Sequence, residues 1–303
     1  MPPSAPDITV CICTYRRPDL LKRLLDELAR QETGGGFTFS VVVTDNDRLE
    51  SARPVAVAAA AAFPEGVTYC VEPRQNIALA RNQALAHARG DYVAFIDDDE
   101  FPAPGWLETL FQARQRFGAD GVLGPVKPHF DQAPPSWLIK GGFFDRPTHP
   151  TGHVLDWEHC RTGNVLLKRS VMPADEPPFR PEFAGGGEDR NFFHRMIDAG
   201  HVFVWCDEAV AYEVVPPARW KRRVLLRRAL LRGKMALNQP GGRTRGLAVS
   251  LVAVPLYAVA LPFLALAGQH RLMKGLIKLC DHAGRVLAFV GLNPVREVYV
   301  TEP

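Results

Sequence analysis

The sequence predicts an α/β fold built on a mainly parallel sheet, and three observations carry this prediction. Short apolar runs at residues 8–13, 67–71 and 92–96 have the continuous pattern of strands that are buried on both faces. Segments with apolar residues at helical spacing separate these runs. Clusters of polar and acidic residues follow several of the runs directly. Alternation at this pace is typical of a parallel sheet that is covered by helices on both faces.

The elements of the first half follow one another regularly. Pro18 suits the first turn of a helix, where its missing N–H is not needed, and leucines recur at helical spacing from Leu20 to Leu28. The next elements alternate between strand and helix, and we predict them over residues 37–44, 51–62, 67–71, 76–88 and 92–96. A further helix signal opens at Pro104.

The pattern loosens after residue 120. Residues 124–160 are rich in Gly, Pro, His and aromatic residues, which predicts a long loop region that forms one wall of a site. A short strand is expected over residues 164–167. A helix is expected over residues 188–199, and the chain enters it from the glycine run 185–187.

Charge divides the chain unevenly. Residues 1–213 carry 21 Lys and Arg against 30 Asp and Glu, whereas residues 214–303 carry 15 against 3. An acidic body with a basic tail points to an anionic partner near the C-terminus, for which nucleic acid and anionic lipid are the two candidates. Residues 219–234 predict a cationic amphipathic helix.

The tail also contains 24 residues without a charge, over residues 246–269. This stretch is long enough to cross a hydrocarbon core of about 30 Å. It holds two prolines and has basic residues on both flanks, which fits a simple single span poorly. A kinked hairpin or an in-plane insertion, with both ends on the cytoplasmic side, is the favoured interpretation. Residues 271–292 are amphipathic again.

The most informative segment is the acidic cluster Asp97-Asp98-Asp99-Glu100 at the end of an apolar strand. Adjacent carboxylates at a strand end repel one another and are costly to desolvate. A cation relieves this cost, and carboxylate oxygens suit Mg²⁺ or Mn²⁺. Ligands of open α/β sheets also bind beyond the carboxyl ends of the strands. The alternative is a solvated acidic turn.

Six cysteines are scattered without zinc-ligand spacing or a disulfide framework. The N-terminus lacks the basic-then-apolar pattern of a secretory signal. These features favour a cytoplasmic protein with reduced thiols.

Taken in order, the motifs resemble an inverting family 2 glycosyltransferase with the GT-A (Rossmann-like) nucleotide-sugar-binding fold, and most of all the bacterial exopolysaccharide enzymes of that family. The matching segments are VCICTYRRPDLL, VVVTDND, RQNIALARNQAL, DDDE, RTGNVLLKRS, GGGEDRNFFHRMIDAG and the basic segment from Arg219. The resemblance implies transfer of a hexose from a nucleotide sugar, with UDP as the expected nucleotide, to a saccharide acceptor in cell-surface polysaccharide synthesis.

The resemblance also implies roles for individual residues. Asp189 is the expected base that deprotonates the acceptor hydroxyl, with Glu188 as the second choice. Asp99 is the expected ligand of Mg²⁺ or Mn²⁺. The expected nucleotide-sugar-binding residues are Thr14, Arg16, Asp45, Arg81, Asp97 and Asp98. The expected residues of the acceptor or donor-sugar pocket are Gly163, Asn164 and Glu188.

Each of these roles has a structural alternative. Asp45 could form the turn after its strand, and Arg81 could pair with a structural carboxylate. Asp98 could simply be solvated, as could Glu100. Glu188 and Asp189 could merely favour the helix macrodipole.

We therefore expect a catalytic domain over residues 1–213, a basic amphipathic segment over 214–245 and membrane-associating helices over 246–303. Such an enzyme would act at the cytoplasmic face of the inner membrane on an acceptor linked to polyprenyl diphosphate. The competing interpretations are a non-catalytic nucleotide-sugar or saccharide-binding protein and a basic-tailed nucleic-acid binder. The long uncharged stretch argues against nucleic acid, and residues 13–18 lack the glycine fingerprint of a dinucleotide-dependent oxidoreductase.

Overall fold

The structure is a computed structural model that describes residues 7–183, 186–237, 243–292 and 295. It divides the chain into two compact units. The first comprises Met1–His129 and Arg146–Val214, and the second comprises Phe130–Asp145 and Val215–Pro303. The short segment Phe130–Asp145 therefore groups with the C-terminal part of the chain.

The first unit is built on a seven-stranded sheet with the strand order β3-β2-β1-β4-β8-β6-β9. Strands β1 to β4 are mutually parallel, and β8 is antiparallel to both of its neighbours. The strands are β1 (Ile8–Thr14), β2 (Phe39–Asp45), β3 (Val67–Val71), β4 (Tyr92–Phe95), β6 (Gly121–Leu123), β8 (Val165–Lys168) and β9 (Phe203–Trp205). The central strands β1 and β4 are mostly apolar because both of their faces are buried.

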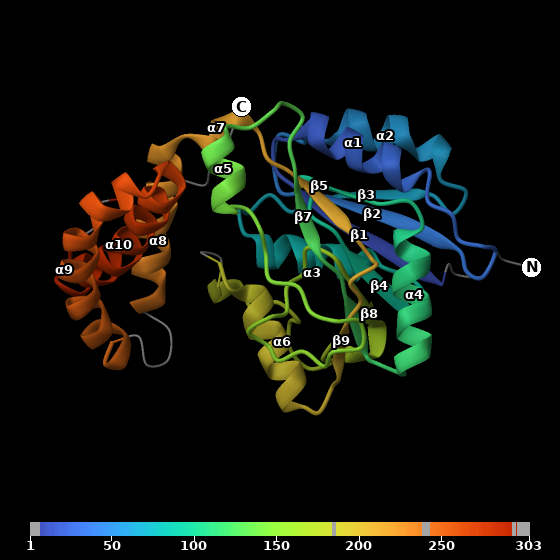
Figure 1. Cartoon of the computed structure of the whole chain (residues 1–303). Coiled ribbons are helices and arrows are strands. Elements are labelled where there is room, and N and C mark those ends of the chain that lie inside the picture. The colour runs from blue at the N-terminus through green and yellow to red at the C-terminus, as the bar shows by residue number, and fades with distance from the viewer. Residues whose placement is uncertain (1–6, 184–185, 238–242, 293–294, 296–303) are drawn as a thin grey trace, which may run out of the picture. The chain divides into compact units, whose positions relative to one another are not determined.

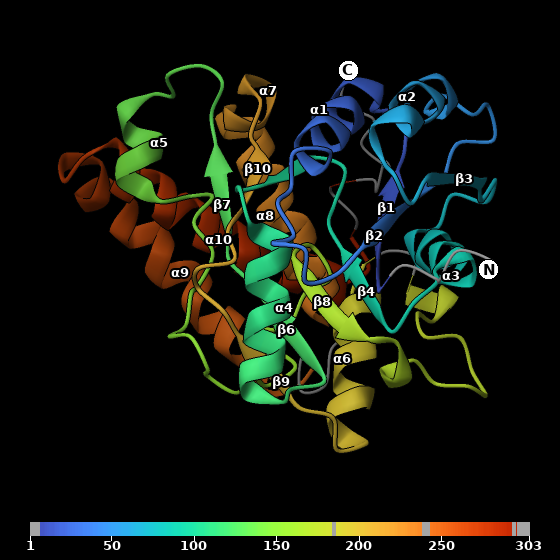
Figure 2. The ribbon, with the colours of Figure 1, turned by 90° about the vertical axis from the view of Figure 1, so that its right-hand side faces the viewer.

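Helices cover both faces of this sheet, as Figures 1 and 2 show. One face packs against α1 (Pro18–Leu28), α2 (Arg53–Ala59) and α4 (Trp106–Phe117), and the other packs against α3 (Ile77–His87) and α6 (Glu188–Asp198). Short 3-10 turns extend three loops, at Ala60–Ala62, Arg169–Val171 and Pro181–Phe183. The layered α/β architecture that the sequence predicts is confirmed.

A second, three-stranded sheet lies within the first unit, with the order β5-β10-β7. Its strands are β5 (Glu100–Pro102), β7 (Val126–His129) and β10 (Ala211–Val214). Strand β5 begins inside the acidic cluster, so this small sheet fixes the backbone of Glu100. The sequence did not predict β5, β6, β7, β9 or β10, because strands of three or four residues are too short to show a period.

The second unit is helical. Its helices are α5 (Ser136–Gly141), α7 (Pro217–Trp220), α8 (Arg222–Leu237), α9 (Arg245–Leu266) and α10 (Gln269–Phe289). Leu138, Leu225 and Met273 form its small core. Helices α8 and α10 cross closely at two glycines. A Cβ atom on Gly233 would lie 2.0 Å from the Asp281 carbonyl oxygen, and one on Gly284 would lie 2.2 Å from that of Leu230.

Helix α9 runs unbroken through Pro255 and Pro262. The kinked hairpin predicted within residues 246–269 is therefore wrong, and the chain turns only at Gly268, from which α10 returns along α9. At the far end of this pair, Ser250 Oγ and His282 Nδ1 lie 3.0 Å apart.

The long loop predicted over residues 124–160 contains two elements, β7 and the short helix α5. The predicted strand at 164–167 and the helix at 188–199 are present as β8 and α6. Gly185 of the predicted glycine run lies outside the described residues.

Candidate active site

The acidic cluster lies where the carboxyl ends of β1 and β4 meet. Because these strands are parallel neighbours, Thr14 at the end of β1 reaches the cluster, and its Oγ1 donates to Asp98 Oδ2 at 2.8 Å. Arg17 Nη1 contacts two members of the cluster, Asp98 Oδ1 at 3.0 Å and Asp99 Oδ2 at 3.3 Å. Asp98 is only 5% exposed, so it is not the solvated side chain of a surface turn.

Glu100 of the acidic cluster lies opposite another carboxylate, Glu213, on the neighbouring strand of the small sheet. Glu100 on β5 and Glu213 on β10 are direct partners in the antiparallel register, and both are buried. Arg146 lies between them, with Nη2 at 2.5 Å from Glu213 Oε2 and Nη1 at 3.8 Å from Glu100 Oε1. Glu100 Oε1 is buried and accepts no hydrogen bond from the residues that the structure describes.

The cluster holds more negative charge than these two arginines offset. Burial raises the pKa of Asp99 to about 7, and the charges of Asp98, Asp97 and Glu213 add to this effect. Burial likewise raises the pKa of Asp98 and of Glu100. Crowded carboxylates with raised pKa values and an unsatisfied buried oxygen fit a divalent cation.

Among the described residues, no three or more His, Cys, Asp or Glu side chains are arranged as a ready ligand set for a metal ion. A cation such as Mg²⁺ is usually held by one or two carboxylates together with the phosphates of a substrate.

A chain of charged groups connects the acidic cluster to α6. Arg81 on α3 is buried, and its Nη1 donates to Glu188 Oε1 while its Nη2 lies 3.4 Å from Asp97 Oδ1. Glu188 Oε2 is buried and has no hydrogen-bond partner within the described part of the chain, and burial raises the Glu188 pKa despite the Arg81 charge. Arg81 thus has the carboxylate partner that the structural alternative describes, but this partner lies in the candidate site.

Asp189 follows at the first turn of α6. Its Oδ1 accepts from the Arg190 backbone N–H at 2.7 Å, and its side chain is partly exposed. Gly187 precedes the helix with φ of 96°, a left-handed conformation that favours glycine. Of the two adjacent carboxylates, Asp189 is therefore the accessible one, whereas Glu188 is held by Arg81.

Asp45 and Arg16 lie on the other side of β1. Asp45 is fully buried at the end of β2 and accepts hydrogen bonds from Asp47 N at 3.0 Å, Ala52 N at 2.7 Å and Tyr69 Oη at 2.9 Å. These donors occupy both carboxylate oxygens of Asp45. This is the structural alternative for Asp45, in which its side chain holds the turn after β2. Arg16 adopts a left-handed φ of 54° and pairs with Asp47 at 3.1 Å.

Gly163 lies directly beside the acidic cluster, just before β8. A Cβ atom at this position would lie 3.0 Å from Asp97 Oδ2 and 2.9 Å from Glu100 Oε1, so a larger residue would displace the carboxylates. The side chain of Asn164 makes hydrogen bonds that stabilise the fold. Its Oδ1 accepts from Trp106 Nε1 at 2.7 Å, and its Nδ2 donates to the carbonyl oxygens of Pro125 and Ala209.

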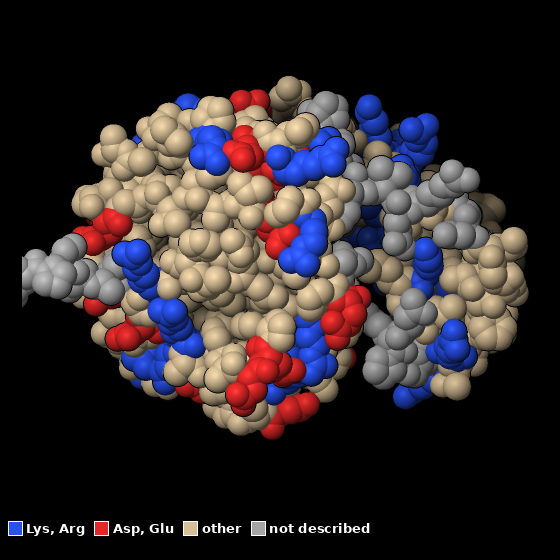
Figure 3. Space-filling view, turned by 180° about the vertical axis from the view of Figure 1, so that it is seen from behind, with Lys and Arg blue, Asp and Glu red and all other residues tan. Residues whose placement is uncertain are grey.

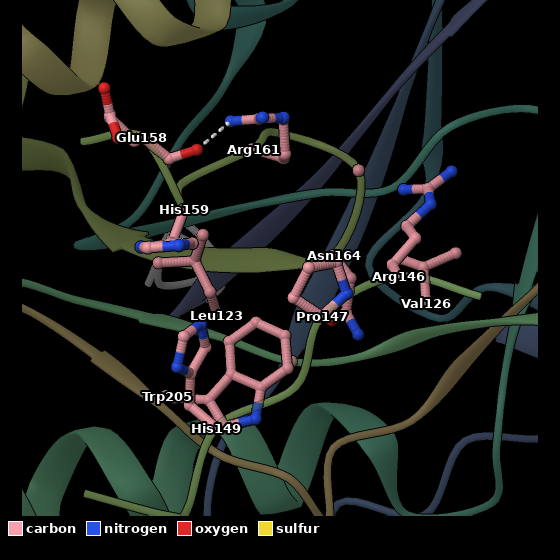
Figure 4. A pocket seen from close by; sticks show the side chains of 12 residues that line it. Leu123, Val126, Arg146, Pro147, His149, Glu158, His159, Arg161, Asn164 and Trp205 are labelled. Atoms are coloured by element: carbon pink, nitrogen blue, oxygen red, sulfur yellow. Dashed lines mark hydrogen bonds between the residues drawn. The ribbon is translucent and has the colours of Figure 1, made fainter. Parts of the chain in front are cut away.

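Gly163 also lines a cavity of about 250 Å³. Figure 4 shows the side chains around this cavity. Several of its lining residues come from the loop between β7 and β8, which the sequence predicted as one wall of a site. The side chains with polar atoms in this lining are Arg146, His149, Glu158, His159, Arg161, Asn164 and Trp205. Sequence reasoning did not single out Arg146, His149, Glu158, His159 or Trp205, because isolated polar residues in a loop carry no periodic signal.

Comparison with known proteins agrees with this geometry. The family model described as glycosyl transferase family 2 matches residues 9–169. The succinoglycan biosynthesis protein ExoM of Rhizobium meliloti (strain 1021) is 30% identical over 98% of this chain and 97% of its own length.

Two solved structures share the fold. The mannosyltransferase PcManGT from Pyrobaculum calidifontis, in complex with GDP-Man and Mn²⁺, superposes with a TM-score of 0.62 at 20% identity, over 95% of this chain and 88% of its own. Residues 1–349 of S. aureus TarS, in complex with UDP, superpose with a TM-score of 0.56 at 15% identity, over 96% and 94% of the two chains. The fold is GT-A, and the chain belongs to glycosyl transferase family 2.

Proposed function

We propose that this protein transfers a hexose from a nucleotide sugar, with UDP as the nucleotide, to a saccharide acceptor with inversion at the anomeric carbon. The catalytic domain in this proposal comprises residues 1–213. The observation that carries the proposal is the undercompensated acidic cluster at the ends of β1 and β4, which Arg81 and Glu188 connect to Asp189. ExoM and the UDP complex of TarS support the substrate class.

Asp99 would hold Mg²⁺ or Mn²⁺ together with the diphosphate, and Asp97 and Asp98 would complete this surface. When bound, the cation would stabilise the charge that develops on the departing diphosphate. Thr14 keeps Asp98 in place through its hydroxyl. Arg81 holds Asp97 and Glu188 on either side of its guanidinium, so it would orient the donor side of the site.

Asp189 would take the proton of the acceptor hydroxyl. The acceptor oxygen would then form its bond to the anomeric carbon while the bond from that carbon to the diphosphate oxygen breaks, and the electron pair would leave with the nucleoside diphosphate. Glu188 would act as a positioning residue through Arg81, because its carboxylate is buried and paired. Asp45 and Arg16 would shape the nucleotide end of the site through the turn after β2.

Binding measurements test the donor part of this proposal. We expect UDP to raise the melting temperature of the full chain more than GDP or dTDP does, and we expect Mn²⁺ to increase the UDP effect. If none of the three nucleotides shifts the melting temperature, with or without Mn²⁺, the proposed function is wrong.

The second unit supports a membrane-docking role for residues 246–303, next to the basic segment 214–245. Helix α9 is long and apolar enough to cross a membrane, by length and composition. Only 11% of its most apolar 18-residue stretch is buried, so most of this apolar surface is not covered by the rest of the protein. Apart from Leu251, its exposed large apolar side chains recur every three or four positions and so share one face: Val249, Val252, Leu256, Val259, Phe263 and Leu266.

Basic residues flank this face. Arg243 and Arg245 are exposed at the start of α9, and Arg271, Lys274 and Lys278 are exposed on α10. Figure 3 shows basic side chains and uncharged surface on these helices. Each Lys or Arg near an anionic leaflet contributes about 1 kcal/mol, and the buried apolar face adds to it.

An in-plane position of α9 at the cytoplasmic face of the inner membrane accounts for both the apolar stripe and its basic flanks. A transferase held there would extend a saccharide on a polyprenyl diphosphate carrier, in the synthesis of an exopolysaccharide. This assignment makes the nucleic-acid interpretation of the basic tail unnecessary.

A further inference from the structure

Arg161 lines the cavity beside Gly163 and has no carboxylate partner among the described residues. Its Nη1 donates to the backbone carbonyl oxygens of Glu158, at 3.0 Å, and of Cys160. Both acceptors belong to its own loop, and neither carries a formal charge. The guanidinium is therefore held in place, but its charge is not neutralised.

No carboxylate among the described residues pairs directly with Arg161, although the charge of Asp189 acts on it. Burial lowers the pKa of Arg161, the charges of Arg190 and Arg146 act in the same direction, and Asp189 opposes them. A guanidinium nevertheless stays protonated in proteins. Glu158 also lines the cavity, but its carboxylate lies on the far side of its own backbone from Arg161 (Figure 4). An exposed guanidinium that lines the cavity and pairs with no carboxylate among the described residues can bind an anionic ligand.

The other guanidinium of the cavity is already used. Arg146 pairs with Glu213 and lies against Glu100, so its charge is committed to the acidic cluster. Apart from Glu158 and Asn164, the other side chains of the wall are apolar or aromatic, including the rings of His149, His159 and Trp205. Burial, together with the nearby His159 and His153, lowers the pKa of His149, so this ring is neutral at pH 7.

Size and position define what this cavity can hold. Its volume of about 250 Å³ is below the range of roughly 300–1,000 Å³ that accommodates drug-sized ligands, which suits a single sugar ring. Gly163 lines this cavity, and a Cβ atom on it would lie 3.0 Å from Asp97 Oδ2 and 2.9 Å from Glu100 Oε1, so the cavity adjoins the acidic cluster. Asp189 is the carboxylate whose charge acts most strongly on Arg161, which places the proposed base near the same cavity.

We infer that this cavity binds an acidic sugar residue, and that Arg161 holds its carboxylate. A planar guanidinium pairs with a carboxylate through two parallel hydrogen bonds, which gives both strength and orientation. The inference rests on the proposed glycosyltransferase function and narrows its substrate class, because one of the two saccharides in the reaction would carry a uronate. The acid could belong to the donor sugar or to the acceptor residue, and the following experiment separates the two sources.

Two pairs of probes are compared on the full chain in the presence of Mn²⁺. The donor pair is UDP-glucuronate and UDP-glucose, and the acceptor pair is a glucuronate-terminated disaccharide and its glucose-terminated counterpart, with UDP present. We expect calorimetry to show at least tenfold tighter binding of the acidic member in one of the pairs, because a charge-assisted hydrogen bond contributes about 1.5–3 kcal/mol. The pair that shows the preference identifies the source of the acid.

Variants then assign the preference to Arg161. Arg161→Gln should abolish it while UDP itself binds with unchanged affinity, and Arg161→Lys should restore part of it because the charge returns without the planar fork. Arg169→Gln is the matched control, because it removes the same charge from an exposed arginine at the opposite end of β8 and should keep the full preference. Melting temperatures verify that each variant is folded.

Three results would overturn the inference. The first is UDP binding by the wild type with no preference for the acidic member of either pair. The second is a preference that survives in folded Arg161→Gln. The third is a loss of UDP affinity in that variant, which would assign Arg161 to the nucleotide. Failure of the wild type to bind UDP at all would instead refute the proposed function on which the inference rests.

Discussion

Glu100 and Glu213 stand opposite each other across the antiparallel pair β5–β10, both buried, with the Arg146 guanidinium between them. Like charges at directly opposed positions destabilise a sheet. A protein that keeps two buried carboxylates together requires positive charge there, and Arg146 supplies only part of it. This relationship extends the acidic cluster beyond its four consecutive residues to a strand that lies more than a hundred positions later.

The first prediction concerns this pair. Arg146→Gln should lower the free energy of unfolding by about 2–3 kcal/mol, because it removes the positive charge that Glu213 and Glu100 share. Adding Glu213→Gln should recover part of the loss, since it removes one of the uncompensated charges. Urea denaturation of the single and double variants measures this coupling. Strictly additive effects would show that the ion pair contributes nothing.

The second prediction concerns Asp99. Asp99→Asn should remove the Mn²⁺-dependent part of UDP binding and abolish transfer, because the amide lacks the charge that holds the cation. Since burial raises the pKa of Asp99, the neutral amide should leave the melting temperature unchanged or higher. Calorimetry of UDP binding with and without Mn²⁺ provides the measurement. A variant that keeps more than a tenth of the wild-type rate in saturating Mn²⁺ would rule out this role.

The third prediction separates two adjacent carboxylates. Asp189→Asn should reduce kcat by at least about 100-fold with little change in donor affinity, as expected when a general base is lost. Glu188→Gln should instead weaken donor binding and lower the melting temperature, because it removes the charge of the buried carboxylate that pairs with Arg81 and leaves only Asp97 to balance this guanidinium. If donor binding collapses in Asp189→Asn, the two roles must be exchanged.

The fourth prediction concerns stability far from the site. Asp120 accepts from Lys168 Nζ at 2.9 Å and from Val202 N at 3.1 Å. Burial opposes its ionisation, but these hydrogen bonds outweigh burial and lower the Asp120 pKa. A carboxyl group with a lowered folded pKa stabilises the protein above its unfolded pKa and loses that contribution as the pH falls.

Asp120→Asn should therefore cost about 1 kcal/mol at pH 7, and this difference should shrink as the pH falls below about 4. Asp26→Asn is the control, because its ion pair with Lys22 is exposed and should change stability by less than about 0.5 kcal/mol. Urea denaturation at pH 7 and at lower pH supplies both values. A difference that grows on acidification would contradict the sign of the Asp120 shift.

The fifth prediction concerns membrane docking by α9. Replacing Val252, Val259 and Phe263 by Ser should weaken sedimentation with anionic liposomes, because these side chains are exposed on one face of the helix. Leu49→Ser with Val57→Ser is the control, since these apolar residues are equally exposed but lie in the first unit. If the two sets of substitutions have equal effects on sedimentation, α9 is not the docking surface.

The sequence predicted the parts of the molecule in which neighbouring residues carry the signal. Short apolar runs predicted strands β1 to β4, and four consecutive acidic residues marked the end of β4. The pairing of Glu100 with Glu213 could not be predicted in this way, because the register between two very short strands depends on the tertiary fold. Motif resemblance proposed Asp45 as a ligand-binding residue, whereas its hydrogen bonds to Ala52 and Tyr69 depend on how the turn after β2 folds.

The central claim is that the chain transfers a sugar from a nucleotide donor, and incorporation of labelled hexose tests it most directly. The wild-type chain, UDP-hexose donors, Mn²⁺ and lipid extracts that contain polyprenyl-diphosphate-linked saccharides are incubated together, and both lipid-linked label and released UDP are measured. We predict equal amounts of the two products with wild type, and neither product with Asp99→Asn or Asp189→Asn. Tight UDP binding without release of UDP or labelled product, from any donor and acceptor pool tested, would contradict the account and identify a non-catalytic nucleotide-sugar-binding protein.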